Sequence, residues 1–390
     1  MEKWIECKIS DIGTVVGGAT PSTKKPENYE NGDIAWITPK DLSSFSGRYI
    51  QRGERNITEI GLKSCSTQLL PKNTVLFSSR APIGYVAIAE NAVCTNQGFK
   101  SVIPNEDTDP IFLYYLLKYN KDKIESMGSG TTFKEVSGNT MKNIVVSVPQ
   151  DKQVQEKIAS VLDAIDEKIE ENERINNNLE QQAKALYKNW FFDFSTFSSD
   201  GNLPDGWRLG TVGDIIQLHD SKRVPLSGAE RDKMAKVYPY YGAASRMDYV
   251  DSYLFDGIYL LLGEDGTVVD SLGFPILQYV YGQFWVNNHA HIITGKEGFS
   301  VEELYLLFSL TNIKSIVTGA VQQKVSQQNL KKVPAIIPGK EALDAFDEII
   351  QPVFTQIRNL RDENANLAIL RDTLLPKLMS GELDVSDINL

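Results

Sequence analysis

The feature of this sequence that most constrains its fold is an internal repeat. Residues 129–149 read SGTTFKEVSGNTMKNIVVSVP, and residues 318–338 read TGAVQQKVSQQNLKKVPAIIP. A glycine, a Val-Ser pair, a lysine and the closing proline coincide at an offset of 189 residues. Each half also opens alike, with WIECKISDI from Trp4 and WRLGTVGDI from Trp207. Because these features recur in the same order, the chain is predicted to contain two homologous domains.

A helix is predicted just before each glycine loop. In the first half, DPIFLYYLLKYNKDKI starts at Asp109, a capping residue, with Pro110 at the first helical position. In the second half, SVEELYLLFSL starts at Ser300, and Glu303 can complete a capping box. Short apolar runs such as TVLFSS, GYVAIAE, GIYLLLG and FPILQYVYG, broken by Gly, Pro and Asn, predict strands. Each half is therefore predicted to be a mixed α/β domain.

A heptad pattern follows each copy of the repeat. Apolar, small or Asn residues, with one Arg, recur at alternating spacings of four and three, which is typical of a coiled-coil seam. The two seams register at an offset of 188 residues, which makes Asn176 and Asn364 equivalent. The first seam consists of Ile158, Leu162, Ile165, Ile169, Asn172, Asn176, Leu179, Ala183, Leu186 and Trp190. The second consists of Ile350, Val353, Ile357, Leu360, Asn364, Leu367, Arg371, Leu374 and Leu378.

Each apolar stripe needs a surface to pack against, since burying one Leu or Ile contributes about 1.5–3 kcal/mol. Two such stripes in one chain are expected to pack on each other. If the two halves are related by a pseudo-two-fold axis, the helices run antiparallel. The first seam, residues 158–190, is then about 50 Å long at ~1.5 Å per residue. Its polar positions would select one register. A simple dimerisation zipper is the alternative.

The charge distribution divides the chain in the same way. Residues 1–150 carry 17 basic and 16 acidic side chains, and residues 201–340 carry 13 and 14. Residues 151–200 carry 6 and 11, and residues 341–390 carry 4 and 10. The net charge of −11 is therefore confined to the two helical segments. The two near-neutral domains hold enough Lys and Arg to form basic faces for phosphate groups.

Several classes of protein are disfavoured by what the sequence lacks. No apolar run approaches the ~20 residues that span a bilayer, and MEKWIECKIS does not resemble a secretory signal. Cys7, Cys65 and Cys94 lack a metal-binding spacing and fit a reducing cytoplasm. We find neither a glycine-rich S-adenosylmethionine loop with an Asn/Asp-Pro-Pro-aromatic tetrapeptide nor an acidic cluster with a catalytic lysine. A cytoplasmic protein is expected, and the missing motifs disfavour a nuclease or a methyltransferase.

Two diverged domains on a rigid spacer suit a target with two separated parts. On duplex DNA, half-sites one helical turn apart lie ~34–36 Å from each other. A spacer of about 50 Å can hold two small domains at that separation. Because the two domains differ in sequence, the expected DNA site is asymmetric.

The order of domain, long helix, domain and long helix resembles the specificity subunit of type I DNA restriction-modification systems. In the first half the resemblance rests on WITPKDLSS, LFSSRAPIGYVAI and CTNQGF. In the second half it rests on YPYYGAASRMDYVDSYLFDGIYLLLGEDG and FWVNNHAHII. The two G…VS…K…VP ends and the final LPKLMSGEL complete it, so that it covers essentially the whole chain.

The resemblance implies two homologous α/β target-recognition domains, residues 1–150 and 201–340. They would be joined by a central helix in residues 151–200 and a C-terminal helix in residues 341–390, packed as an antiparallel coiled coil. It implies a non-catalytic subunit that reads a bipartite double-stranded DNA site and binds two adenine methyltransferase subunits and a restriction and translocase subunit. It implies no cofactor here, with S-adenosylmethionine, ATP and Mg in the partner subunits. The alternatives are an enzyme with its own nuclease or methyltransferase activity, and a pure assembly scaffold.

Polar side chains at loop ends are the candidate DNA contacts of the first half. Arg pairs well with guanine and Asn with adenine, whereas acidic side chains can accept from cytosine. The two glycine loops differ in side chains at equivalent places, as expected of readout loops on one scaffold. The alternatives are plain connecting loops and, for Arg80, a surface salt bridge. The candidates are Thr38, Lys40, Ser79, Arg80, Asn96, Gln97, Thr131, Thr132 and Lys134.

In the second half the same reasoning selects residues in YPYYGAASR, LLGEDGT, VNNHAH and GAVQQK. Alternation places His289 and His291 on the same side of a strand. Zinc would need further ligands, and His219 lies in an unrelated loop, so a structural histidine or a DNA contact is favoured over a metal. A plain turn is the alternative for the acidic pair, and packing is the alternative for the Tyr and Arg. The candidates are Tyr241, Arg246, Glu264, Asp265, Asn288, His289, His291, Gln322, Gln323 and Lys324.

Overall fold

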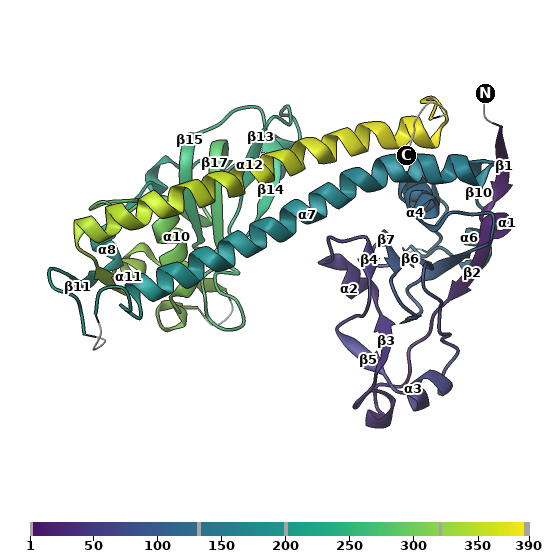
Figure 1. The fold of residues 1–390 in the computed structure, drawn as a ribbon, viewed down its shortest axis with the longest axis horizontal. Helices are drawn as coiled ribbons and strands as arrows, with labels where there is room; N and C mark the ends of the chain where they lie inside the picture. Colours follow the sequence, from purple (N-terminus) through teal and green to yellow (C-terminus); the bar gives the residue numbers. More distant parts are fainter. Residues whose placement is uncertain (1–2, 131–133, 199–201, 320–321, 386–390) are drawn as a thin grey trace. The chain divides into compact units, whose positions relative to one another are not determined.

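The chain folds into two compact units, each of which contains a globular part and a stretch of each of two long helices (Figure 1). Unit 1 comprises Met1–Asn172 with Asp362–Leu390, and unit 2 comprises Glu173–Arg361. The predicted architecture of two mixed α/β domains with two long helices is confirmed. The computed structural model describes residues 3–130, 134–198, 202–319 and 322–385.

Unit 1 is built around antiparallel pairing of its first strand with the strand that precedes the first long helix. Trp4 of β1 pairs with Pro149 of β10, and Lys8 pairs with Val145. Two further sheets have the strand orders β2-β9-β6-β7-β4 and β5-β3-β8. The strands are β1 (Trp4–Lys8), β2 (Gly13–Gly17), β3 (Ile34–Ile37), β4 (Tyr49–Ile50), β5 (Arg55–Ile57), β6 (Val75–Ser79), β7 (Ile83–Ala89), β8 (Cys94–Thr95), β9 (Lys100–Pro104) and β10 (Val145–Pro149). The helices are α1 (Ile9–Ile12), the 3-10 helix η1 (Pro26–Asn28), α2 (Pro39–Ser43), α3 (Glu59–Lys63), α4 (Pro110–Tyr119), α5 (Lys121–Ser126) and α6 (Gly138–Asn143).

Unit 2 repeats this plan with a larger sheet. Arg208 of β11 pairs with Ile337 of β20, as the first and last strands pair in unit 1. The main sheet has the order β12-β18-β15-β17-β13-β14, and β16 pairs with β19. The strands are β11 (Arg208–Thr211), β12 (Ile216–Leu218), β13 (Tyr238–Tyr241), β14 (Arg246–Val250), β15 (Phe255–Gly263), β16 (Asp265–Gly266), β17 (Leu277–Val286), β18 (Ala290–Gly295), β19 (Gln323–Lys324) and β20 (Pro334–Ile337). The helices are α8 (Val212–Ile215), η2 (Asp220–Lys222), α9 (Gly228–Arg231), α10 (Val301–Leu310), η3 (Lys314–Ile316) and α11 (Gln327–Lys331).

The helix starts predicted from capping residues are confirmed. The Asp109 side chain accepts a hydrogen bond from the Phe112 N–H at the start of α4. Ser300 and Glu303 form a capping box at the start of α10. The first helix is interrupted, however, because Asn120 leaves the helical conformation and its Nδ2 donates to the Leu116 carbonyl at 2.9 Å. The predicted segment therefore forms two helices, α4 and α5.

The long helices α7 (Lys152–Phe191) and α12 (Lys340–Met379) run in opposite directions in unit 1. Ile158 and Leu162 of α7 share a core with Leu378 and Met379 of α12. Further along α7, the Asn172 Nδ2 donates to Asn364 Oδ1 at 2.8 Å. Residue numbers therefore fall along α12 as they rise along α7.

The same antiparallel order holds in unit 2. The Arg361 guanidinium donates to Glu180 Oε1 at 2.8 Å. Toward the end of α7, Tyr187 and Phe191 pack on Phe346, with ring centroids 5.4 and 5.0 Å apart. In each unit the helices are part of the hydrophobic core. Among the described residues, none of the helices combines the length and the apolar character needed to cross a membrane.

Candidate nucleic-acid interface

In each unit, two residues at the ends of the glycine loop pair with each other through their backbones at the same position of the repeat. In unit 1, the backbone N–H groups of Ser129 and Glu135 each donate to the other residue's carbonyl oxygen, at 3.0 and 2.9 Å. In unit 2, Thr318 and Lys324 exchange the same pair of bonds, at 2.9 and 2.8 Å. We call the described residues of these segments, 129–130 with 134–135 and 318–319 with 322–324, the glycine hairpins. The two hairpins share this closing pair of hydrogen bonds but not their side chains.

The residue after each glycine hairpin fastens it to the main sheet of its unit. The Val136 N–H donates to the Ser79 carbonyl at 3.0 Å, and the Val325 N–H donates to the Glu264 carbonyl at 2.8 Å. Both valines are fully buried. A serine then caps α6 in unit 1 and α11 in unit 2. The base of each hairpin is therefore held at the end of a central strand, β6 or β15.

Glu135 carries the charge at the base of the unit 1 hairpin. Its Oε2 lies 3.6 Å from Arg80 Nη1, and its Oε1 lies 3.3 Å from Lys100 Nζ. The Lys100 side chain is 14% exposed and its Nζ also reaches Ser79 Oγ at 3.4 Å. The structure thus places Arg80 in the ion pair that was the alternative to a guanine contact, while its side chain stays 35% exposed.

Lys324 carries the charge at the base of the unit 2 hairpin, and its sign is opposite. Its Nζ lies 3.5 Å from Glu264 Oε1. Glu264 Oε2 in turn accepts from Arg223 Nη1 at 2.6 Å, and the same Nη1 donates to the Ala290 carbonyl at 2.8 Å. In unit 1 the anion Glu135 is therefore held by Arg80 and Lys100, whereas in unit 2 the cation Lys324 is held by Glu264.

A buried polar cluster lies behind the unit 2 hairpin. His291 is fully buried, with Nδ1 2.6 Å from Asp220 Oδ2 and Nε2 2.8 Å from the Val325 carbonyl oxygen. Burial alone would raise the pKa of Asp220, but hydrogen bonds from His291 and from the Ile292 N–H outweigh it, and the pKa is lowered. Asp220 is therefore an anion that orients the imidazole. The imidazole, in turn, contacts the residue that follows the hairpin.

Asp220, Glu264 and His291 offer three ligand atoms within 4.8 Å of one another, which is a possible metal-binding arrangement. The carboxylate oxygens are already engaged, because Arg223 lies 2.6 Å from Glu264 and His291 lies 2.6 Å from Asp220. These carboxylate oxygens are therefore occupied by side chains of the protein itself. The cluster thus fits a structural network better than a metal site.

His289 and His291 do not lie on the same side of one strand, which corrects the expectation from alternation. His289 lies in the turn between β17 and β18, whereas His291 lies in β18. The His289 Nδ1 lies 2.5 Å from Asp265 Oδ1, and its side chain is 44% exposed. Asn288 is also exposed, and its carbonyl oxygen accepts from Arg223 Nη1 at 3.3 Å. The turn and the acidic pair therefore form one surface beside β19, since Asp265 pairs with Lys324.

The remaining candidates of unit 2 divide between surface and packing. Gln322, Gln323 and Lys324 are exposed on the hairpin. Tyr241 is half-buried against Phe284, with ring centroids 5.9 Å apart, and burial raises the pKa of its phenol. Arg246 is exposed and its guanidinium lies 4.8 Å from the centre of the Tyr249 ring.

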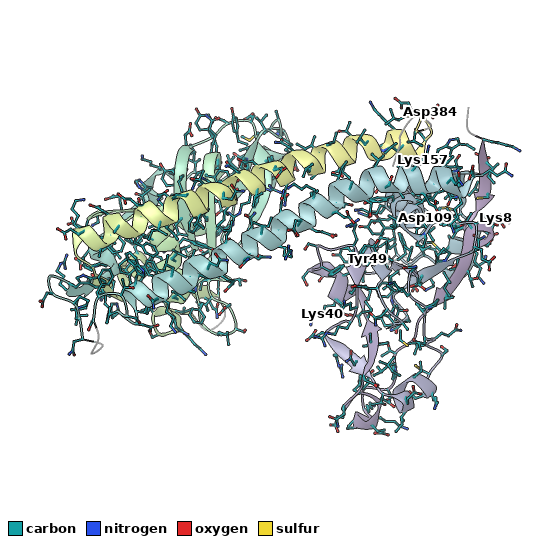
Figure 2. All side chains as sticks on the ribbon, in the orientation of Figure 1. Lys8, Lys40, Tyr49, Asp109, Lys157 and Asp384 are labelled. Carbon is teal, nitrogen blue, oxygen red and sulfur yellow. The ribbon has the colours of Figure 1, made fainter. Side chains whose placement is uncertain are left out.

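In unit 1, Thr38 and Lys40 lie at the start of α2. The Thr38 N–H and Oγ1 both contact Asp41 Oδ2, at 2.7 and 2.6 Å, which closes the capping box. Lys40 projects into solvent and pairs with Glu54 at 2.7 Å (Figure 2). The hydroxyl of Thr38 is thus used within the protein, whereas the Lys40 ammonium group is accessible.

The CTNQG loop presents one accessible side chain and one internal one. The Asn96 Oδ1 accepts from the Gly98 N–H at 2.8 Å and shapes the loop. Gln97 is exposed, and its Oε1 contacts the hydroxyl of Thr20. Gln97 is therefore the better placed of the two for a base contact.

The remaining candidates differ in how accessible their side chains are. Ser79 and His291 are fully buried, so neither side chain is accessible to a duplex in this structure. The Ser79 hydroxyl instead donates to the Gly98 carbonyl at 3.1 Å. Lys134 is exposed beside the hairpin base. Thr131 and Thr132 lie outside the described residues.

Each seam position proposed from the heptad pattern is buried or half-buried. The buried ones are Ile158, Leu162, Ile165, Asn172, Asn176, Ala183, Ile350, Ile357, Leu360 and Leu378. The half-buried ones are Ile169, Leu179, Leu186, Trp190, Val353, Asn364, Leu367, Arg371 and Leu374.

The seam includes polar layers. The Asn364 Nδ2 donates to the Ile169 carbonyl at 3.1 Å, while its Oδ1 accepts from Asn172. Arg371 donates to Asp166 Oδ1 at 2.7 Å, and Asp166 Oδ2 accepts from the Tyr115 hydroxyl at 2.7 Å. These contacts fix the register of α7 and α12 within unit 1.

Sequence reasoning missed Arg48, which fastens α7 to the rest of unit 1. The residue is 3% exposed, and its backbone N–H and Nε both donate to Glu170 Oε1 at 3.0 Å. It also pairs with Asp163. More than 100 residues separate Arg48 from these partners, so no local pattern indicates the contact. Arg223 was missed for the same reason.

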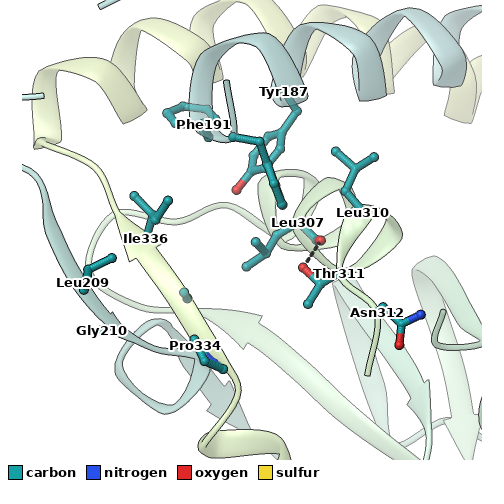
Figure 3. A pocket seen from close by; sticks show the side chains of 12 residues that line it. Tyr187, Phe191, Leu209, Gly210, Leu307, Leu310, Thr311, Asn312, Pro334 and Ile336 are labelled. Atoms are coloured by element: carbon teal, nitrogen blue, oxygen red, sulfur yellow. Dashed lines mark hydrogen bonds between the residues drawn. The ribbon is translucent and has the colours of Figure 1, made fainter. Parts of the chain in front are cut away.

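An apolar groove of about 470 Å³ opens in unit 2 between the end of α7, α10 and the β11–β20 pair (Figure 3). Tyr187 is the one titratable group among the twelve described residues that line it. Burial raises the pKa of this phenol well above its usual value, so it stays protonated. Among the described residues that line the groove there is no carboxylate, imidazole, thiol or amine side chain.

Comparison with known proteins gives a consistent match. A family model described as the type I restriction modification DNA specificity domain matches residues 1–181 and again residues 204–367. The MjaIX type I restriction enzyme specificity subunit of Methanocaldococcus jannaschii is 35% identical over 99% of this chain and 94% of its own length. The EcoprrI specificity subunit of Escherichia coli is 23% identical over 92% and 90%. Among solved structures, the S subunit of a type I restriction-modification system from M. genitalium has a TM-score of 0.59 with 18% identity, covering 97% of this chain and 96% of that one.

Proposed function

Because this chain belongs to the type I restriction-modification DNA specificity family and is a specificity subunit with two target-recognition domains, we propose that it reads a bipartite, asymmetric DNA site. Each unit reads one half of the site. The helix pair α7 and α12 sets the distance between the halves. The chain itself catalyses no step of methylation or cleavage.

The observation that carries this proposal is the pair of glycine hairpins. They close at equivalent positions of two homologous units. Their sequences differ, because the repeat aligns Gln322, Gln323 and Lys324 of unit 2 with Phe133, Lys134 and Glu135 of unit 1. Reuse of one backbone scheme with different side chains is what two different base sequences require. Each of the helices α7 and α12 has 40 residues, which corresponds to a length of about 60 Å at ~1.5 Å per residue.

The accessible polar side chains near the hairpins are the proposed DNA contacts. In unit 2 they are the glutamines and Lys324 of the hairpin with Asn288 and His289 of the neighbouring turn. In unit 1 the accessible groups are Lys134, Arg80 and Gln97. Lysine and arginine supply the salt-dependent affinity for phosphates, whereas the amide groups are suited to base edges.

The proposed partners follow from membership of the family. Two adenine methyltransferase subunits bind this chain, and a restriction and translocase subunit completes the complex. S-adenosylmethionine, ATP and Mg act in those subunits, and this chain binds none of them. The complex acts in the cytoplasm, where the DNA is.

Sequencing of methylated adenines in cells that contain this chain with its methyltransferase tests the proposal. We expect one interrupted motif that disappears when the gene is deleted. Replacing residues 1–150 with those of a relative should change one half of the motif and leave the other half and the gap unchanged. A continuous motif, or a change in both halves, would contradict the proposal.

The two alternatives give different results. An enzyme with its own activity would transfer methyl groups from S-adenosylmethionine, or cut DNA, as the purified chain alone, and we expect neither. A pure assembly scaffold would bind all duplexes equally. We expect tighter binding to a duplex that carries the motif identified by methylation sequencing. The logarithm of this affinity should fall linearly with the logarithm of the salt concentration.

A further inference from the structure

We infer that Glu135 and Lys324 are positioning residues that hold the two glycine hairpins in reading orientation through ion pairs of opposite sign. The inference rests on the proposed function, because it concerns how each hairpin is presented to DNA. It assigns to Glu135 a role opposite to the one its charge suggests. An acidic side chain near a phosphate backbone weakens binding, whereas here it supports recognition.

In unit 1, Glu135 connects three separate segments. Its backbone closes the hairpin with Ser129, while its carboxylate contacts Arg80 at the end of β6 and Lys100 at the start of β9. Lys100 is held at the same time by Ser79 Oγ at 3.4 Å and the Gln97 carbonyl at 3.5 Å. The carboxylate therefore fixes the hairpin to the CTNQG loop and to Arg80, both of which carry proposed contacts.

In unit 2, the equivalent position is Lys324, which lies 189 residues later. Its ammonium group faces Glu264, which is anchored by Arg223 at 2.6 Å. The Glu264 side chain is 15% exposed and the Lys324 side chain is 51% exposed, so solvent screens this ion pair in part. The charged residue of each hairpin is thus opposite in sign to its partners on the sheet of its own unit. It has the same sign as the equivalent partners in the other unit.

Variants of Glu135 in unit 1 distinguish a positioning role from a direct electrostatic effect on DNA. The two roles predict changes of DNA affinity in opposite directions. If Glu135 is only a surface anion, its removal strengthens binding to every duplex, since one repulsive charge is lost. If Glu135 positions the hairpin, its removal weakens binding to the cognate site alone. In unit 2 both roles of Lys324 predict a loss, so the decisive variants belong in unit 1.

The experiment uses the purified complex of this chain with its methyltransferase subunits. Fluorescence anisotropy measures Kd for a duplex that carries the motif methylated by the wild-type complex and for a scrambled duplex of equal length. The variants are Glu135→Gln and Glu135→Lys. The second variant puts the residue type found at the equivalent position of unit 2, a lysine, beside Arg80 and Lys100. The matched control is Glu59→Gln, which removes a carboxylate from the exposed pair with Lys63 in the same unit.

We expect Glu135→Gln to lower the ratio of cognate to scrambled affinity by about tenfold, comparable to the loss of one base-pair contact. Glu135→Lys should lower the ratio further, although it adds a positive charge. Glu59→Gln should leave the ratio within about twofold, because its pair touches neither hairpin. Sequencing of methylated sites in cells should show relaxed selectivity at one half-site and full selectivity at the other, which also shows that the variant folds.

An unchanged ratio for Glu135→Gln, with both affinities raised equally, would overturn the inference and leave the proposed function intact. Relaxation of the half-site read by unit 2 would overturn it as well. If Glu135→Lys does not fold, Glu135→Gln still decides, because it introduces no repulsion. Failure of the wild-type complex to methylate an interrupted motif would instead count against the proposed function.

Discussion

At the scale of single residues, Glu303 combines a local role with an unusual environment. It is fully buried, yet its Oε2 accepts from the Ser300 N–H at 2.8 Å in the capping box of α10. Burial raises the pKa of Glu303 to about 8, against 4.5 for an ordinary glutamate. Between these values the folded chain binds more protons than the unfolded chain, so stability falls as pH rises through this window.

We therefore predict that Glu303→Gln stabilises the protein more at pH 9 than at pH 5. Glutamine keeps an oxygen that accepts from Ser300 but cannot ionise. Thermal unfolding of both proteins from pH 5 to pH 9 measures the effect. The control is Glu230→Gln in the capping box of α9, where hydrogen bonds from Ser227 lower the pKa. There the charged form is favoured, so the substitution should cost stability above pH 4.5, and that difference should disappear in acid. An equal gain from Glu303→Gln at both ends of the pH range would contradict the prediction.

Residue-scale prediction from sequence succeeded where the signal was local. Asp109 and Ser300 cap helices through neighbours three residues away, and such spacing is visible in the sequence. The role of His291 was not visible, because its partner Asp220 lies 71 residues earlier in the chain. The buried state of Ser79 was not visible either, since a serine at the end of a strand has no pattern that distinguishes inside from outside.

At the scale of elements, the polar layer formed by Asn172 and Asn364 joins α7 to α12 in unit 1. We predict that Asn172→Leu alone destabilises the fold by about 1–2 kcal/mol, because Asn364 Oδ1 loses its donor. The double variant, which adds Asn364→Leu, should lose less unfolding free energy than the sum of the losses of the two single variants. The reason is that two leucines restore an apolar layer. Urea unfolding of the four proteins gives the coupling energy.

A control for that layer is Asn366→Leu, which lies on an exposed position of α12. Its effect should stay within about 0.5 kcal/mol. Purely additive effects of the two seam substitutions would show that the asparagines do not act as a pair.

The long helices were predictable because a heptad pattern over several turns identifies both the element and the face that it buries. The break at Asn120 between α4 and α5 was less predictable, because asparagine is tolerated in helices and its bond to Leu116 forms only in the folded backbone. The contacts of Arg48 with α7 depend on the tertiary fold alone.

At the scale of the whole molecule, the internal repeat determined what could be predicted. Two copies of one sequence pattern imply two homologous domains, and the pairings β1–β10 and β11–β20 confirm that equivalence. The repeat cannot reveal the charge inversion between Glu135 and Lys324 as a structural feature, because the partners Arg80, Lys100 and Glu264 lie elsewhere in the sequence.

We propose that the helix pair sets the distance between the two half-sites. Duplicating residues 172–178 in α7 and 358–364 in α12 adds one heptad to each helix and keeps the seam in phase. The added length is about 10 Å, which corresponds to about three base pairs of duplex. A variant of unchanged length, Asn177→Ala with Asn366→Ala on exposed positions, is the control.

The measurement is sequencing of methylated adenines in cells that contain each variant with the methyltransferase. We predict that the duplication reduces methylation at the original gap by about tenfold or more. The remaining methylation should fall on the same two half-sites, separated by about three additional base pairs. Undiminished methylation of the original motif by the duplicated chain would contradict the account.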